Sequence, residues 1–132
     1  MVEGLIKIRS DKKDMQEVEA EVIHGKALGR QMGFPTLNMD IANRTDIANG
    51  VYRSEVEVDG TRYISMSNVG VRPSVDGHTR LLETHLFGYS GNLYGRRLRV
   101  RLLEKIRDER KFASLADLQE QLEIDKQQIL NH

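Results

Sequence analysis

"VYRSEVEV" at residues 51–58 and "TRYISMSNVG" at residues 61–70 are two runs typical of β-strands, joined by Asp59 and Gly60. An Asp-Gly pair readily adopts the positive φ angles that a two-residue hairpin turn needs. The two runs therefore predict an antiparallel hairpin, which is the strongest local signal in the chain. The other predicted elements lie before and after this hairpin in the sequence.

Further runs of strand type lie on both sides of this hairpin. Before it, residues 17–24 alternate Glu with Val or Ala, and residues 37–41 form a short second run. After it come residues 81–89 and the long run 94–106, in which Leu98, Val100 and Leu102 alternate with arginines. Such alternation is typical of strands with one buried face. Polar loops are predicted at 42–50 and 107–112, and a Pro/Gly loop at 71–80.

The last segment changes from strand to helix periodicity. Ser114 and Asp117 are placed for an N-cap and a first-turn charge. Apolar residues then recur at helical spacing and predict the packed face of one C-terminal helix: Leu115, Leu118, Leu122, Ile129 and Leu130. We expect about six antiparallel strands closed into a barrel, since closure removes exposed edges, with this helix packed outside. The barrel domain is predicted over residues 17–132, after a lead-in or edge segment at 1–16.

Composition excludes several classes of protein. The 132 residues carry equal numbers of acidic and basic side chains, so no overall positive charge attracts nucleic acid or anionic membranes. The absence of cysteine excludes disulfides, thiolate catalysis and Cys-based zinc sites. The four histidines have no zinc-binding spacing. No apolar run is long enough to span a bilayer, so we expect a cytoplasmic protein without a membrane partner.

A glycine-rich segment, "HGKALGRQMGFPTLN", occupies residues 24–38. Its glycines at 25, 29 and 33 recur every four residues, and backbone amides in such a loop can bind phosphate oxygens. Two cations add positive charge, so the candidate phosphate-binding residues are Gly25, Lys26, Gly29, Arg30 and Gly33. A simple glycine-rich turn between strands explains the same spacing, and the residues alone leave both interpretations open.

The end of this segment carries a pair of oxygen-bearing side chains. Pro35 favours an extended chain, so Thr36 and Asn38 point to the same side while Leu37 points into the core. A hydroxyl and an amide oxygen side by side suit a hard cation such as Mg²⁺, or phosphate oxygens.

A second candidate lies in "ETH" at residues 83–85. Strand alternation places Glu83 and His85 on one face and the core residues Leu82, Thr84 and Leu86 on the other. Glu83 is therefore either a solvated strand residue or a carboxylate on a rigid strand, able to take a proton from a hydroxyl group.

Six ordered segments together resemble the riboflavin kinase (flavokinase) family, in particular the C-terminal kinase module of bacterial bifunctional riboflavin kinase/FAD synthetases. The first is the glycine-rich segment, which is similar to a family motif ending in Pro-Thr-Ala-Asn. The others are "GVY" at 50–52, "SNVGVRPS" at 67–74, "ETHLF" at 83–87, "LYGRRLRVRLLEKIRDERKF" at 93–112 and "SLADLQEQLEIDKQQ" at 114–128. One motif is a weak signal, whereas six in order are specific.

The resemblance implies a mainly β fold, a six-stranded antiparallel Greek-key barrel, and transfer of the ATP γ-phosphate to the 5′-hydroxyl of riboflavin, giving FMN. By motif, Glu83 matches the general base, and Thr36 and Asn38 match the residues that hold Mg²⁺ and ATP. The glycine-rich residues named above match the nucleotide loop, with Tyr94 beside the adenine. The matches on the flavin side are Arg107, Glu109, Lys111, Phe112 and Asp125.

Departures from the family pattern qualify this expectation. Ala27 and Leu28 stand where the family usually has Gly and a cation, which predicts weaker nucleotide binding. The His-x-Gly-His motif of the adenylyltransferase module is absent, so we expect the chain to stop at FMN, linked to or paired with a separate FAD synthetase adenylyltransferase.

Two rival functions are compatible with the same sequence. A flavokinase-like module can sense flavin or bind RNA as a regulator, with weak or no kinase activity; the altered loop and the arginines at 97, 99 and 101 favour it. An unrelated small barrel that binds oligonucleotides is disfavoured by the few aromatic side chains. The arginine stripe itself is predicted to be a solvated strand face.

Overall fold

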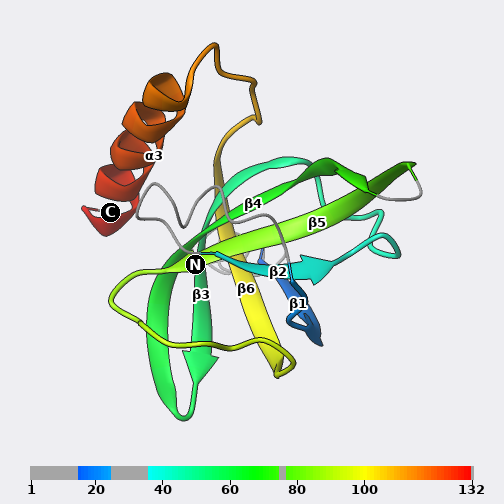
Figure 1. Ribbon diagram of the computed structural model, residues 1–132. Coiled ribbons are helices and arrows are strands. Elements are labelled where there is room, and N and C mark those ends of the chain that lie inside the picture. The colour runs from blue at the N-terminus through cyan, green and yellow to red at the C-terminus, as the bar shows by residue number, and fades with distance from the viewer. Residues whose placement is uncertain (1–14, 25–35, 75–76, 132) are drawn as a thin grey trace, which may run out of the picture.

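The computed structural model describes residues 15–24, 36–74 and 77–131, which form six antiparallel strands and one helix (Figure 1). The strands are β1 (Gln16–Glu21), β2 (Leu37–Asp40), β3 (Gly50–Val58), β4 (Thr61–Ser74), β5 (Gly77–Leu86) and β6 (Arg97–Arg107); the helix is α3 (Leu115–Leu130). Among these residues, no helix has both the length and the hydrophobicity needed to cross a bilayer.

The strand order β1-β6-β3-β4-β5-β2 contains a Greek key. Strands β3, β4 and β5 follow one another, and β6 returns through a long connection to lie beside β3. The two end strands then approach each other, because the Ile23 amide donates to the Asn38 carbonyl at 2.8 Å just beyond β1. The sheet is thus a nearly closed barrel, and the predicted fold class is confirmed.

The hairpin that anchors the prediction has the expected turn. Asp59 and Gly60 have φ angles of 51° and 85°, and Val58 pairs with Thr61 across the turn. Two successive positive φ angles are typical of a type I′ turn, whose twist matches that of the strands. Local chemistry therefore sets the register of β3 against β4.

The barrel interior combines an apolar core with a buried chain of hydroxyl groups. Leu82, Val100 and Leu102 are among the fully buried apolar residues. Four buried hydroxyl groups form a chain in which neighbouring oxygens are 2.7–2.8 Å apart: Ser65, Ser54, Ser67 and Thr84. Since each of these hydroxyls has a partner, the cost of burying them is offset.

Helix α3 packs outside the barrel (Figure 1). It begins at Ser114, whose side chain accepts a hydrogen bond from the Asp117 amide at 3.1 Å, as predicted. Ile129 packs against Val51 and Met66 on the outer face of β3 and β4.

The prediction that Leu115 and Leu130 belong to the packed face of the helix is wrong. Leu115 and Leu130 are 57% and 47% exposed. Successive helix positions are separated by about 100°, so Leu130 cannot face the sheet together with its neighbour Ile129. Leu115 lies in the first turn and does not reach the sheet.

The Pro/Gly loop predicted at 71–80 is also wrong. β4 continues through Pro73 to Ser74 and β5 begins at Gly77, so most of this stretch is a two-stranded ribbon. Pro73 is tolerated because β3 pairs with β4 only as far as Val69. Beyond that point β4 has one open edge, where a residue without an amide hydrogen costs no ladder bond.

Candidate active site

Three polar side chains form a row across neighbouring strands β2, β5 and β4. Asn38 pairs with Glu83, and Glu83 pairs with Asn68 on its other side. Cross-strand partners project from the same face of a sheet. That face is the outer one, because a chain neighbour of each is completely buried in the barrel: Met39, Leu82 and Val69.

Arg72 lies on the same face of β4, four residues beyond Asn68. Its Nη2 atom donates to Oε1 of Glu83 at 2.9 Å and to Oε2 of Glu109 at 2.7 Å. Glu109 belongs to the segment 108–113 that follows β6. One guanidinium thus joins the central carboxylate of the row to a segment distant in sequence.

Arg72 remains a cation in this environment. Burial opposes its charge, but the hydrogen bonds and attraction from Glu109 and Glu83 outweigh burial and raise its pKa above the usual value. Its side chain and those of both carboxylates are about one-quarter exposed. Solvent therefore screens the cluster only in part.

Two amide oxygens in the row are buried without a hydrogen-bond partner in the described part of the chain: Oδ1 of Asn38 and Oδ1 of Asn68. Buried polar atoms are usually paired, so unpartnered oxygens flanking a carboxylate point to a ligand. Thr36, half-buried, lies two residues before Asn38 along the same chain. These oxygens fit a hard cation such as Mg²⁺, which binds hydroxyl and amide oxygens together with phosphate.

No cluster of three or more acidic, histidine or cysteine side chains that could hold a metal occurs among the described residues. A cation bound beside Asn38 would therefore take several of its oxygen ligands from substrate or water. This is the usual state of Mg²⁺ in nucleotide sites.

The predicted flavin residues Arg107 and Asp125 bind each other. The Arg107 guanidinium contacts the Asp125 carboxylate at 2.7–3.1 Å, and Gln121 donates to the same carboxylate at 2.9 Å. Asp125 is 1% exposed. The pair fixes α3 to the end of β6, one strand position from the start of the segment 108–113.

Lys111 and Phe112 line an open groove of about 340 Å³ between the segment 108–113 and the first half of α3. The opposite wall includes Gln121 and the half-exposed Ile124. Arg110 stacks near Phe112, with its guanidinium carbon 5.0 Å from the ring centroid. The groove combines apolar side chains with charges of both signs, since Asp117 and Glu120 line it as well as Arg110 and Lys111. Such a lining suits a planar polar ring system.

Tyr94 stacks on His24, with ring centroids 3.5 Å apart and an interplanar angle of 18°. This aromatic pair therefore stands at the first residue of the glycine-rich segment. The predicted phosphate-binding residues Gly25, Lys26, Gly29, Arg30 and Gly33 lie outside the described residues.

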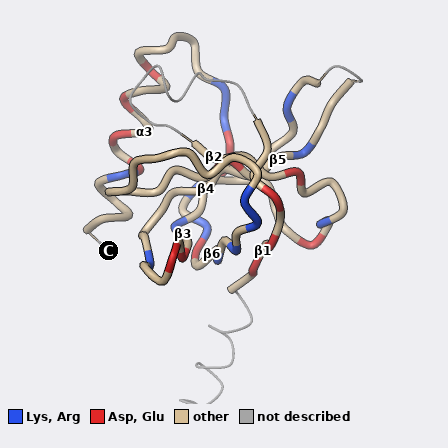
Figure 2. The backbone as a smooth tube through the Cα atoms, turned by 60° about the horizontal axis from the view of Figure 1, so that its bottom comes forward, with Lys and Arg blue, Asp and Glu red and all other residues tan. Residues whose placement is uncertain are grey.

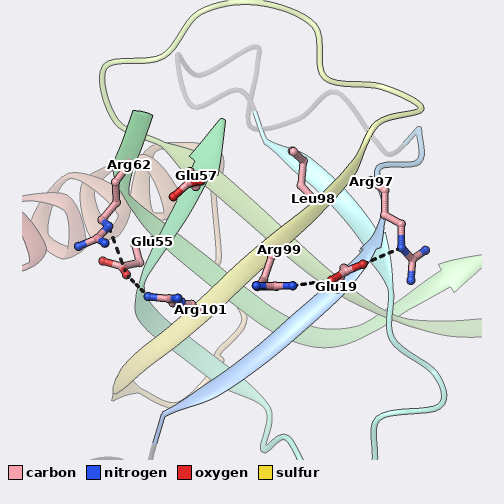
Figure 3. A pocket seen from close by; sticks show the side chains of 8 residues that line it. All are labelled: Glu19, Glu55, Glu57, Arg62, Arg97, Leu98, Arg99 and Arg101. Carbon is pink, nitrogen blue, oxygen red and sulfur yellow. Dashed lines mark hydrogen bonds and ion pairs between the residues drawn. The ribbon is translucent and has the colours of Figure 1, made fainter. Parts of the chain in front are cut away.

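A charged face lies on strands β1, β6 and β3, whereas the polar row lies on β4, β5 and β2 (Figure 2). Glu19 lies between Arg97 and Arg99, bonded to each at 3.0 Å, and Glu55 accepts from Arg101 at 3.3 Å (Figure 3). Hydrogen bonds from Arg99 and Arg97 lower the pKa of Glu19. Strand partners thus neutralise the arginine stripe, which confirms that it is a solvated face.

Sequence reasoning missed Asn68 and Arg72. Both lie in "SNVGVRPS", a stretch whose resemblance to the family implies no role for either side chain. Strand alternation alone puts them on one face. Their proximity to Glu83 depends on the β4–β5 register, which the sequence does not reveal because residues 71–80 resemble a loop.

The family model described as riboflavin kinase (flavokinase) matches residues 13–132. The chain belongs to the riboflavin kinase family. It is 43% identical over 105 residues to a bifunctional riboflavin kinase/FMN adenylyltransferase from Haemophilus influenzae, covering 79% of this chain and 34% of that protein. It is 38% identical over 112 residues to the RNA-binding riboflavin kinase RibR of Bacillus subtilis, covering 84% and 48%.

The fold agrees with this family assignment. A riboflavin kinase from Trypanosoma brucei superposes with a TM-score of 0.63 at 20% identity, covering 89% of this chain and 78% of that one. At this identity the likeness concerns the fold. The chain spans about a third of the length of the bifunctional relatives that it matches.

Proposed function

We propose that this domain is a riboflavin kinase that transfers the γ-phosphate of ATP to the 5′-hydroxyl of riboflavin, giving FMN. The observation that carries the proposal is the row Asn38–Glu83–Asn68, in which a carboxylate stands between two unpartnered amide oxygens. Membership of the riboflavin kinase family supplies the substrate class.

Glu83 acts as the general base in this proposal. Its Oε1 is bound to Arg72, while Oε2 accepts no hydrogen bond from the described residues and can accept one from an alcohol. Phosphoryl transfer through a loose transition state requires mainly positioning and charge neutralisation. A carboxylate within hydrogen-bond reach of the hydroxyl is therefore sufficient.

Thr36 and Asn38 hold Mg²⁺ and the phosphates on the β2 side of Glu83. The bound cation supplies neutralisation of phosphate charge. Asn38 is suited to this role because its Oδ1 is buried and unpartnered. We assign the nucleotide-binding role to Gly25, Lys26, Gly29, Arg30 and Gly33, with the adenine near Tyr94.

Lys111 and Phe112 bind the flavin in the groove against α3. Arg107 and Asp125 contribute by holding α3, which is the opposite wall of that groove. Glu109 lies between the groove and Glu83, bound to Arg72. Arg72 and Glu109 thus connect the row Asn38–Glu83–Asn68 to the proposed flavin groove.

The test is formation of FMN from riboflavin, ATP and Mg²⁺, followed by chromatography. Glu83→Gln should lower kcat by about 10²- to 10⁴-fold, since general-base groups contribute on that order. Binding of riboflavin should be kept, measured by quenching of flavin fluorescence. Glu57→Gln, an exposed glutamate on the charged face, is the matched control. Parental activity in Glu83→Gln would refute the base assignment.

A second candidate is a flavin-dependent regulator that binds RNA, favoured by the similarity to a relative named as an RNA-binding riboflavin kinase. It predicts that the domain binds riboflavin with weak or no FMN formation, and that it binds RNA at low salt. The pairing of Arg97, Arg99 and Arg101 with glutamates weakens this candidate, because neutralised arginines attract phosphate poorly.

The bifunctional relatives also suggest a partner. They join a riboflavin kinase to an FMN adenylyltransferase, and this chain matches about a third of their length. We propose that an adenylyltransferase, on the same or another chain, consumes the FMN made here.

A further inference from the structure

We propose that Arg72 is a positioning residue for phosphoryl transfer, which holds the Glu83 carboxylate and couples it to the segment 108–113 through Glu109. The inference rests on the proposed role of Glu83 as the base. It adds a residue that acts on the base, and a physical link between the base and the flavin side.

The first argument is geometric. Both carboxylates bind the same nitrogen of Arg72, at 2.9 Å and 2.7 Å, and Nη1 of Arg72 donates to the Val71 carbonyl at 3.0 Å. The planar guanidinium is thereby fixed on two sides. A base whose Oε1 is bound to a fixed donor keeps its other oxygen in a defined direction, which pre-organises it for a hydroxyl group.

The second argument concerns charge. The cluster of Glu83, Arg72 and Glu109 contains one cation and two anions. Without the guanidinium, two partly buried carboxylates would face each other with no cation between them, and repulsion would separate them. The position of the Glu83 carboxylate therefore depends on Arg72. How strongly Arg72 binds Glu83 depends in turn on the position of Glu109, because both carboxylates share the same guanidinium nitrogen.

The third argument is the absence of a side chain at Gly70. A Cβ atom there would clash with the carboxylate of Glu109, so Gly70 leaves the space into which Glu109 reaches. Gly70 is two residues before Arg72 on β4. The strand thus provides both the space and the cation for a glutamate from the segment 108–113. Displacement of that segment necessarily changes the partners of Arg72, and hence the restraint on Glu83.

A double-mutant cycle tests the proposal. FMN formation is followed with saturating substrates in the parent, Arg72→Met, Glu83→Gln and the double variant, with Arg62→Met as the control arginine from the same strand. Arg72→Met should lower kcat by about 10- to 100-fold, as expected for a misplaced catalytic group. In the Glu83→Gln background it should have no further effect, because the group that it positions is already lost.

The outcomes separate this inference from the proposed function. Parental activity in Glu83→Gln refutes the base itself. A large loss in Glu83→Gln combined with parental kcat in Arg72→Met, or with an equal fold loss from Arg72→Met in both backgrounds, overturns the inference alone. If Arg72→Met does not fold, Arg72→Lys replaces it in the cycle. Its kcat should fall less than that of Arg72→Met in the parental background, and it should again have no further effect in the Glu83→Gln background.

The coupling to the flavin side has its own readout. Glu109→Gln should lower kcat and raise the KM for riboflavin while leaving the KM for ATP unchanged. A merely structural glutamate would change the unfolding midpoint and neither kinetic constant. Unchanged kinetic constants in Glu109→Gln overturn the coupling.

Discussion

Replacement of Asp125 by Asn tests how α3 is held to the barrel. The substitution keeps the size of the side chain, so it opens no cavity, but it removes the charge that faces Arg107. Asp125 is 1% exposed and receives three hydrogen bonds from Arg107 and one from Gln121. The amide nitrogen of Asn would place a donor against these donors.

The expected loss follows from the burial of the two partners. Removing one member of a fully buried ion pair costs about 3–5 kcal/mol, since the other charge is left without compensation. Arg107 retains 19% exposure and can be partly hydrated after the change. We therefore expect a loss of about 2–4 kcal/mol in the free energy of unfolding for Asp125→Asn.

Urea unfolding at neutral pH measures this loss. With a slope of about 1–3 kcal/mol per molar urea for a small protein, the midpoint should fall by about 1 M or more. Glu19→Gln is the control, because Glu19 also binds arginines, Arg97 and Arg99, but on the solvated face. Its midpoint should not change measurably. Equal midpoints for Asp125→Asn and Glu19→Gln would refute the claim that burial makes the difference.

Three further predictions follow from single contacts. Ser67→Ala, which interrupts the buried hydroxyl chain between Ser54 and Thr84, should cost about 1–3 kcal/mol of unfolding free energy in urea. Gly70→Ala should displace the Glu109 side chain and reproduce the raised riboflavin KM expected for Glu109→Gln, with little change in thermal midpoint. The hydrogen bonds and charge of Arg96 lower the pKa of Asp59, so their contribution is complete above the ordinary carboxyl pKa and is lost as pH falls below about 4. Arg96→Gln should therefore reduce the loss of stability in acid, followed by circular dichroism.

The elements that sequence predicted well are those set by local chemistry. The Asp59–Gly60 turn needs only the two residues that form it, and the alternation of Leu98, Val100 and Leu102 with arginines reports one buried face directly. The N-cap at Ser114 is likewise local. Each of these signals is complete within a few residues, so it could be interpreted without knowledge of any tertiary contact.

The errors occurred where a distant partner decides the outcome. Pro73 suggests a loop when read locally, but it is accommodated in a strand because β3 has already ended beside β4. Leu130 has the right residue type for a packed face, but Ile129 occupies the position that meets the sheet. In both cases the deciding partner is distant in sequence: it is β3 for Pro73, and it is Val51 with Met66, which contact Ile129, for Leu130.

The site shows the same division more sharply. Glu83 and Asn38 were predicted as separate candidates from strand alternation, and their juxtaposition required the pairing of β2 with β5. Arg72 requires more, because its two carboxylates come from β5 and from beyond β6, 11 and 37 residues away. A residue proposed to position a base by joining two remote segments has no signature in its own stretch of sequence. It becomes recognisable only when the register of the β4–β5 ribbon is known, since that register brings Arg72 back over the row that holds Glu83.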